Sequence, residues 1–370
     1  MHMWIQGAVD VLIVVMAVIL ALFTVTLLIL HIITTSNNIR VQRIKKRIIR
    51  MLSVSQDLDY LREQIYQLLD PEGGIRSFRE IRGIQSNRGS IAMTMVVEEA
   101  DPERKELLRR LILRDAWYCG HIRRMLRSRS IDQVGVFTKL VAELQLPDYE
   151  EEIYGNLHRW TDNAENQEIC LLALFMCGYE ENLIALFADP DFRLILSFRQ
   201  LHELFDCYLG DHASLYRKLL ARDCDLYVKR ACVRGIGSEG LTELSPLIEP
   251  YLTSEHINLL IDSVRSAGKL RHRPAEDIIR RHTAHREWSV RNVAVTALAD
   301  IAPESCYEDL LRCLCDPEWW VRFHAAEALS RLRGSEDLME DVTELGDRFA
   351  YEMMQYILER NALLAREVTA

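Results

Sequence analysis

The sequence lacks the short motifs by which many enzymes are identified. It has no glycine-rich phosphate loop, no HExxH, no GxSxG and no CxxC pair. Nothing in it supports a nucleotide-binding, zinc-protease or serine-hydrolase function. We therefore predict a protein that is not an enzyme and that needs no cofactor and no metal.

An excess of basic residues is also lacking, because the formal net charge of the 370 residues is −10. That sign disfavours a nucleic acid as the main partner. The nine cysteines are odd in number and follow no regular spacing between Cys119 and Cys315. Such a pattern indicates free thiols in a reducing compartment rather than a disulfide framework.

Charged residues are absent from one long apolar run, residues 11–33. A helix of that length rises about 35 Å, which is enough to span a bilayer. A cleaved signal peptide is the alternative, but residues 1–10 contain no Lys or Arg and no small-x-small cleavage site follows the run. We therefore predict a transmembrane anchor over residues 1–35.

The direction of the anchor follows from the basic residues on its C-terminal side. Cytoplasmic flanks of membrane spans are enriched in Lys and Arg, so we expect a single-pass plasma-membrane protein with its N-terminus outside and the rest in the cytoplasm. The cluster either contacts anionic headgroups or acts only as a topology signal. Ala17 and Ala21 form a small-xxx-small pair that is compatible with a homodimer of the span. The basic residues are Arg40, Arg43, Lys45, Lys46, Arg47 and Arg50.

Further divisions of the chain follow from breaks in its helical periodicity. Asp101 and Pro102 are suited to the N-cap and first turn of a new helix. We predict a juxtamembrane helix or coiled coil over 36–69, a linker over 70–101, a basic helical part of the solenoid over 102–165, repeats over 166–335 and capping helices over 336–370.

The strongest pattern is a repeat with a period of 31 residues. The segment Trp288-Ser-Val290-Arg291 recurs as Trp319-Trp-Val321-Arg322, and the small and apolar positions that follow recur with it. A fixed period of this length is typical of stacked helical hairpins. The positions that define the repeat are Val228, Val290, Arg291, Ala294, Leu298, Asp316, Pro317, Val321, Arg322, Ala325 and Leu329.

These residues resemble HEAT repeats, in particular the short HEAT-like repeats also found in bilin lyases. The resemblance is carried by the copies that begin at Val290 and at Asp316-Pro317, and it is convincing only after residue 220. It implies an all-α fold, a right-handed α-solenoid, in which the second helix of each pair lines the concave face. It also implies that Arg291 and Arg322, with Lys229 in the same position, form a structural ladder with a turn acid, Asp316 or Glu287.

Comparison of the repeats by column separates core from surface. Trp288 and Trp319 align with leucine and isoleucine, so we predict that they are buried. Trp320 and Tyr227 share a column with Ser289 and a further polar residue, which indicates exposure. Exposed aromatic residues are common binding anchors, although partial burial against a neighbouring turn is the alternative. The candidate partner-binding residues are Trp320, Tyr227 and Phe323.

The sequence thus predicts a membrane-anchored cytoplasmic scaffold that binds a protein partner. A narrower version makes it an accessory subunit of a membrane complex, such as a glycosyltransferase or a transporter. The alternative is a membrane-tethered HEAT-like enzyme, either lyase-like or acting on nucleic acid, which rests on the resemblance alone.

Overall fold

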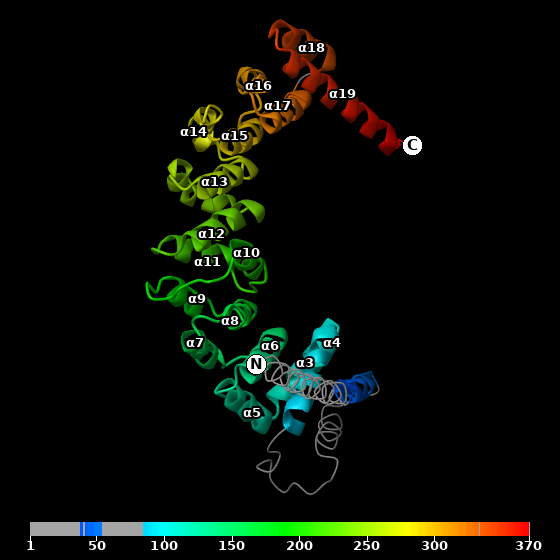
Figure 1. Cartoon of the computed structure of the whole chain (residues 1–370), viewed down its shortest axis with the longest axis vertical. Coiled ribbons are helices and arrows are strands. Elements are labelled where there is room, and N and C mark those ends of the chain that lie inside the picture. The colour runs from blue at the N-terminus through cyan, green and yellow to red at the C-terminus, as the bar shows by residue number, and fades with distance from the viewer. Residues whose placement is uncertain (1–37, 40, 54–83, 333, 370) are drawn as a thin grey trace, which may run out of the picture. The chain divides into compact units, whose positions relative to one another are not determined.

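The computed structural model describes residues 38–39, 41–53, 84–332 and 334–369, whose regular structure is entirely helical. The chain divides into two compact units, Met1–Cys177 and Gly178–Ala370 (Figure 1). The all-α prediction is confirmed for this part of the chain. The predicted anchor, residues 1–35, lies outside the described residues, and within them we find no helix with the length and apolar character that a membrane span requires.

The first unit is built around a layer of three helices, in which α6 packs against both α3 and α8. The helices α5 and α7 pair with α6 and α8, respectively, and form a second layer. A further helix covers residues 41–53. The bounds are α3 Ile84–Glu99, α4 Pro102–Leu113, α5 Ala116–Leu126, α6 Ile131–Leu144, α7 Glu150–Arg159 and α8 Ala164–Met176.

Helix α3 corrects the predicted linker, because residues 84–99 of the expected 70–101 segment are helical. Ala92, Met93, Val96 and Val97 are buried, and their spacing places them on one face of the helix. Packing of this face against α6 outweighs the glycine, serine and asparagine residues early in the segment. The predicted start of the next helix is confirmed, since the Asp101 carboxylate accepts a hydrogen bond from a backbone N–H of α4.

The helix over residues 41–53 carries most of the predicted membrane-flanking cluster. Its apolar stripe, including Ile48, is buried, and Lys45 is buried as well and forms an ion pair with Glu99 of α3. Lys45 is therefore not available to a membrane surface. Arg40 lies outside the described residues, whereas the side chains of Arg43, Lys46, Arg47 and Arg50 are exposed.

The basic helices that follow α3 find acidic partners within the first unit. The carboxylate of Glu152 is nearly buried and forms ion pairs with both Arg123 and Arg127, at 3.1 and 2.6 Å. Lys105 of α4 donates to Glu143 of α6 at 2.6 Å. These ion pairs connect neighbouring helices. Some of the basic residues predicted for the segment 102–165 therefore stabilise the packing of this unit.

The second unit stacks helix pairs, and the second helices lie on the inner side of its curve (Figure 1). We call them the second-helix layer: α10 (Phe198–Asp206), α12 (Leu226–Ser238), α13 (Ile257–Lys269), α15 (Trp288–Ile301), α17 (Trp319–Leu332) and α19 (Arg348–Thr369). The first helices are α9 (Glu180–Phe187), α11 (His212–Leu220), the 3-10 turns η1 (Thr242–Leu247) and η2 (Glu249–Thr253), α14 (Glu276–His282) with η3 (Arg273–Ala275), α16 (Tyr307–Leu314) and α18 (Ser335–Glu344).

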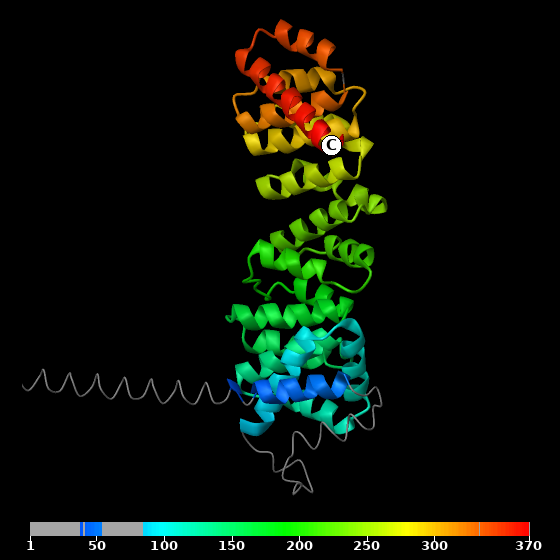
Figure 2. The same ribbon diagram turned by 90° about the vertical axis from the view of Figure 1, so that its right-hand side faces the viewer.

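The predicted 31-residue period is visible in the starts of four second helices. These helices begin at residues 226, 257, 288 and 319. They lie side by side in the order of the sequence, as the green to orange helices of Figure 2 show. The repeat register therefore holds from residue 226 to residue 332.

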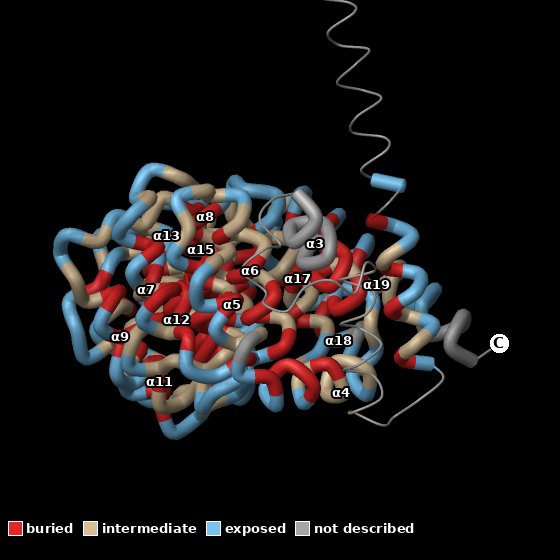
Figure 3. Tube along the Cα trace, turned by 90° about the horizontal axis from the view of Figure 1, so that it is seen from below, coloured by how far each residue is buried: buried red, intermediate tan, exposed pale blue. Residues whose placement is uncertain are grey.

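The core lies between the two helix layers of each unit. Figure 3 shows buried residues along the inner sides of the helices and exposed residues mainly at the turns. In the second unit the predicted repeat positions Val228, Val290, Ala294, Val321 and Ala325 have no exposed surface. Their equal burial in successive copies explains why the same residue types recur.

The burial of Ala325 gives a direct test of the register. Replacing Ala325 by Arg inserts a charge and a long side chain at a position without free volume, so we expect several kcal/mol of destabilisation. The matched control is Ala362→Arg, at an exposed alanine of α19. Thermal unfolding followed by circular dichroism should show a much lower melting temperature for Ala325→Arg and little change for the control. Equal melting temperatures for the two variants would contradict the register.

Candidate functional site

Four aromatic rings gather on the exposed side of α17 and form what we call the aromatic patch: Trp319, Trp320, Phe323 and His324. The Trp319 ring lies 4.7 Å from the Trp320 ring and stacks on Phe323 at 5.0 Å. Trp320 stacks on His324 at 6.2 Å, and Phe323 meets His324 edge-on at 5.3 Å. Both stacks join residues four apart, which one helical turn places above each other.

The patch is exposed because its two indoles extend beyond the space between neighbouring helices. Trp319 is 44% exposed and Trp320 is 51% exposed. The predicted exposure of Trp320 is confirmed, but the predicted burial of Trp319 and of Trp288, which is 41% exposed, is wrong. Leu226 and Ile257 in the same column are only partly buried. An indole is larger than either side chain, so its additional atoms remain in solvent.

Helix α19 extends the patch with one cation, Arg360, and one more aromatic ring, Phe349. The Arg360 guanidinium lies 5.2 Å from the Phe323 ring centre and donates to Glu327 at 2.6 Å. The Arg322 guanidinium lies 5.5 Å from the ring of Phe349, a residue that is 63% exposed. Cation–π contacts of this kind hold aromatic rings in place at a surface.

His324 links the patch to the preceding repeat. Its Nδ1 lies 2.7 Å from Oδ1 of Asn292 on α15 and 2.9 Å from the backbone oxygen of Trp320. A carbonyl oxygen can only accept, so Nδ1 carries the proton and donates. The imidazole is therefore held between two helices, and Trp320 stacks on a ring whose orientation is fixed.

Arginine side chains fix the turn that leads into α17. Arg291 donates to both carboxylate oxygens of Asp316, at 2.7 and 2.9 Å. Its remaining nitrogen donates to the backbone oxygens of His285 and Arg286. Arg322 makes the corresponding hydrogen bonds to the backbone oxygens of Asp316 and Pro317. The predicted ladder is therefore present for Arg291 with Asp316. Lys229 pairs instead with Asp223, within its own turn.

The third candidate residue, Tyr227, lies in a separate cluster of the same layer. Tyr227 is 39% exposed and meets Phe198 of α10 edge-on at 6.0 Å. Arg230 lies 3.8 Å from the centre of the Phe198 ring and pairs with Asp262 at 2.8 Å. The structure thus joins Trp320 with Phe323 in one cluster and places Tyr227 in another.

The sequence did not indicate that four further residues belong to this surface: Trp319, His324, Phe349 and Arg360. The pairs Trp319/Phe323 and Trp320/His324 are each four residues apart on a predicted helix, and that spacing was the available signal. Phe349 and Arg360 belong to α19, whose sequence no longer follows the repeat. Only the fold brings them next to α17.

Burial keeps three of the thiols in a poorly reactive form. Burial raises the pKa of Cys170 and Cys313 to about 12 and that of Cys306 to about 11. A thiol with so high a pKa is protonated at neutral pH and is a poor nucleophile. Among the described residues no group of His, Cys, Asp and Glu is arranged to hold a metal ion.

The exposure of both indoles leads to a stability prediction. Each of Trp319→Ala and Trp320→Ala removes a side chain that is already about half in solvent, so we expect a loss well below the roughly 3–5 kcal/mol of a buried Trp. In thermal unfolding, the melting temperatures of both variants should be close to that of the wild type and well above that of Ala325→Arg. A large loss of stability for Trp319→Ala alone would show that this indole is part of the core.

One family model matches the repeat segment of the chain. Residues 276–350 match the family model of HEAT repeats. Among solved structures, the chain is similar to an engineered protein, at 15% identity over 85% of this chain and 98% of that one, with a TM-score of 0.37. It is also similar to the CpcE–CpcF complex of phycocyanin lyase from Nostoc sp., at 14% identity over 73% and 99%, with a TM-score of 0.26. No curated protein matches the chain. Residues 276–350, from α14 to the start of α19, are thus HEAT-like helical repeats.

Proposed function

We propose that this chain is a membrane-anchored scaffold that binds a protein partner through the second-helix layer of its second unit, with the aromatic patch as the main contact. The observation that carries the proposal is the exposure of Trp319 and Trp320 side by side. Aromatic side chains that lose little conformational freedom on binding dominate many interfaces. The patch is also held in place before a partner arrives, by stacking and by His324, which lowers the entropic cost of association.

The position of the patch favours a macromolecular partner. It lies on a continuous layer of parallel helices, and such layers present an extended surface to elongated ligands. The cluster of Phe198, Tyr227 and Arg230 lies on the same layer of this unit and offers a second contact. A partner that spans α10 to α17 would contact both clusters.

The membrane part of the proposal rests on the sequence. Residues 11–33 supply the span, and the basic residues after it keep the two units in the cytoplasm with the N-terminus outside. Arg43, Lys46, Arg47 and Arg50 are exposed on their helix, as a cluster at a membrane surface requires. In the narrower form of this proposal the partner is a membrane protein, such as a glycosyltransferase or a transporter. We also propose that two copies of the span associate through Ala17 and Ala21.

Partner capture tests the aromatic patch. In affinity purification from solubilised membranes, Trp320→Ala should weaken recovery of partners bound by the wild type, by about 2 kcal/mol or roughly thirtyfold in affinity. The matched control is Leu209→Ala, at an apolar residue that is 57% exposed in the α10–α11 turn. Unchanged recovery with Trp320→Ala, or equal loss with the control, would remove the patch as the contact.

Protease accessibility tests the orientation. A protease added to intact spheroplasts should leave residues 84–370 undigested, because the basic flank retains them inside. The same protease should digest them after detergent opens the membrane. Digestion in intact spheroplasts would contradict the cytoplasmic assignment.

A further inference from the structure

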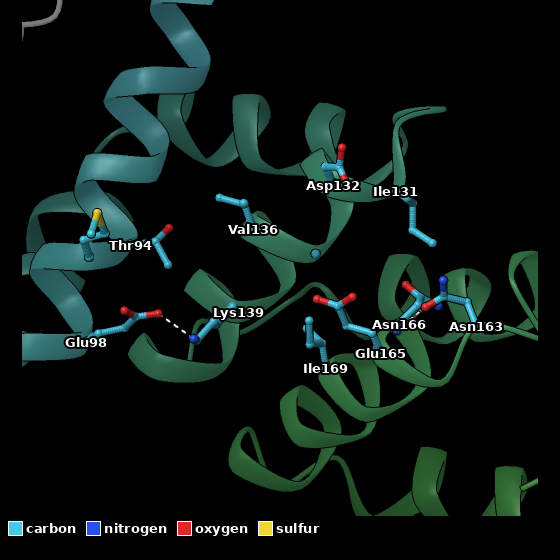
Figure 4. A pocket seen from close by; sticks show the side chains of 12 residues that line it. Thr94, Glu98, Ile131, Asp132, Val136, Lys139, Asn163, Glu165, Asn166 and Ile169 are labelled. Atoms are coloured by element: carbon cyan, nitrogen blue, oxygen red, sulfur yellow. Dashed lines mark hydrogen bonds and ion pairs between the residues drawn. The ribbon is translucent and has the colours of Figure 1, made fainter. Parts of the chain in front are cut away.

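A pocket of about 410 Å³ opens in the first unit between α3, α6 and α8. Figure 4 shows its lining side chains, with Glu98 extending from α3 toward Lys139 of α6 and Glu165 extending from α8 toward α6. The apolar part of the lining consists of Met95, Ile131, Val136 and Ile169, all of them partly exposed. The pocket therefore combines an aliphatic wall with acidic groups.

The charge of the pocket is negative and only partly compensated. Lys139 pairs with Glu98 at 2.5 Å. Asp132 and Glu165 are exposed and have no ion-pair partner among the described residues. Three carboxylates and one lysine line the pocket, so its side chains carry a net negative charge. Asp132 and Glu165 lie in the first turns of α6 and α8, whose N-terminal dipoles offset a part of that charge. A cation placed between the two helices would be attracted by the remainder.

Gly135 of α6 lines the pocket and adds no side chain to it. A glycine in the middle of a helix is destabilising relative to alanine, so its presence needs a reason. Packing does not supply one, because a Cβ at this position would lie 3.8 Å from Cδ1 of Ile169, an ordinary contact. A side chain longer than alanine would occupy the pocket itself.

We propose that this pocket binds an organic cation with an aliphatic stem, an ammonium or guanidinium group of the lysine or arginine type. The stem lies on Val136 and Ile169 beside Gly135, and the head lies between Asp132 and Glu165. An anion would be repelled by these carboxylates, and an uncharged apolar group would gain no electrostatic attraction from them. The same chemistry is found in a basic side chain of a partner protein and in a free polyamine.

Calorimetric titration of the full chain in detergent distinguishes these sources. The probes are a capped alanine pentapeptide with one central arginine, the same peptide with norleucine in place of arginine, and spermidine. We expect the arginine peptide to bind at millimolar or lower concentration and the norleucine peptide to bind at least fivefold more weakly. Binding of spermidine without the arginine peptide would assign the pocket to a free polyamine.

Three variants locate the binding. Glu165→Gln removes one carboxylate at an exposed position and should lower the affinity for the cationic probe roughly three- to fivefold. Gly135→Leu should abolish binding by filling the pocket. The matched control is Gly155→Leu in α7, where an added side chain meets open space and binding should persist.

Two results would overturn the proposal. One is equal binding of the arginine peptide by the wild type and by Gly135→Leu with circular dichroism unchanged, and the other is no binding of any cationic probe at millimolar concentration. The titration needs neither the aromatic patch nor the membrane anchor. Its outcome is therefore independent of the partner-capture experiment.

Discussion

Consecutive second helices of the second unit approach one another at small side chains, and the remaining geometry of this unit depends on that approach. A Cβ on Gly237 of α12 would lie 2.6 Å from Cα of Ser266 on α13, and a Cβ on Gly268 would lie 2.8 Å from Cα of Ala297 on α15. Real Cβ atoms do not tolerate such distances, so glycine is required at both positions. Gly237 and Gly268 are 31 residues apart, which means that the same contact recurs in the next repeat.

This repeated contact determines where the aromatic patch lies. Because each second helix is seated against its neighbour through small residues, the side chains on its other face project into solvent. The bidentate pair of Arg291 with Asp316 then fixes the turn before α17, and so determines where Trp319 and Trp320 begin the helix. A rigid support of this kind lets large aromatic residues remain exposed and in a defined orientation.

The two units offer chemically different surfaces. The second unit presents aromatic rings flanked by arginines on α17 and α19, whereas the first presents an acidic pocket with an aliphatic wall. The scaffold proposed above would use these two surfaces for chemically different ligands. The buried, protonated thiols of Cys170 and Cys313 agree with a structural role for these two cysteines.

The sequence by itself determined the helical class, the 31-residue register and the buried positions Val290, Ala294 and Ala325, because burial imposes the same residue types on each copy. It also identified Trp320 as exposed. It could not determine the exposure of Trp319, since a column of leucine and isoleucine looks apolar whether the site is fully or only half buried. Nor could it reveal α3 as a helix or the pocket beside Gly135, because both depend on the packing of α3, α6 and α8. Those contacts join residues far apart in the chain, and only the tertiary structure decides them.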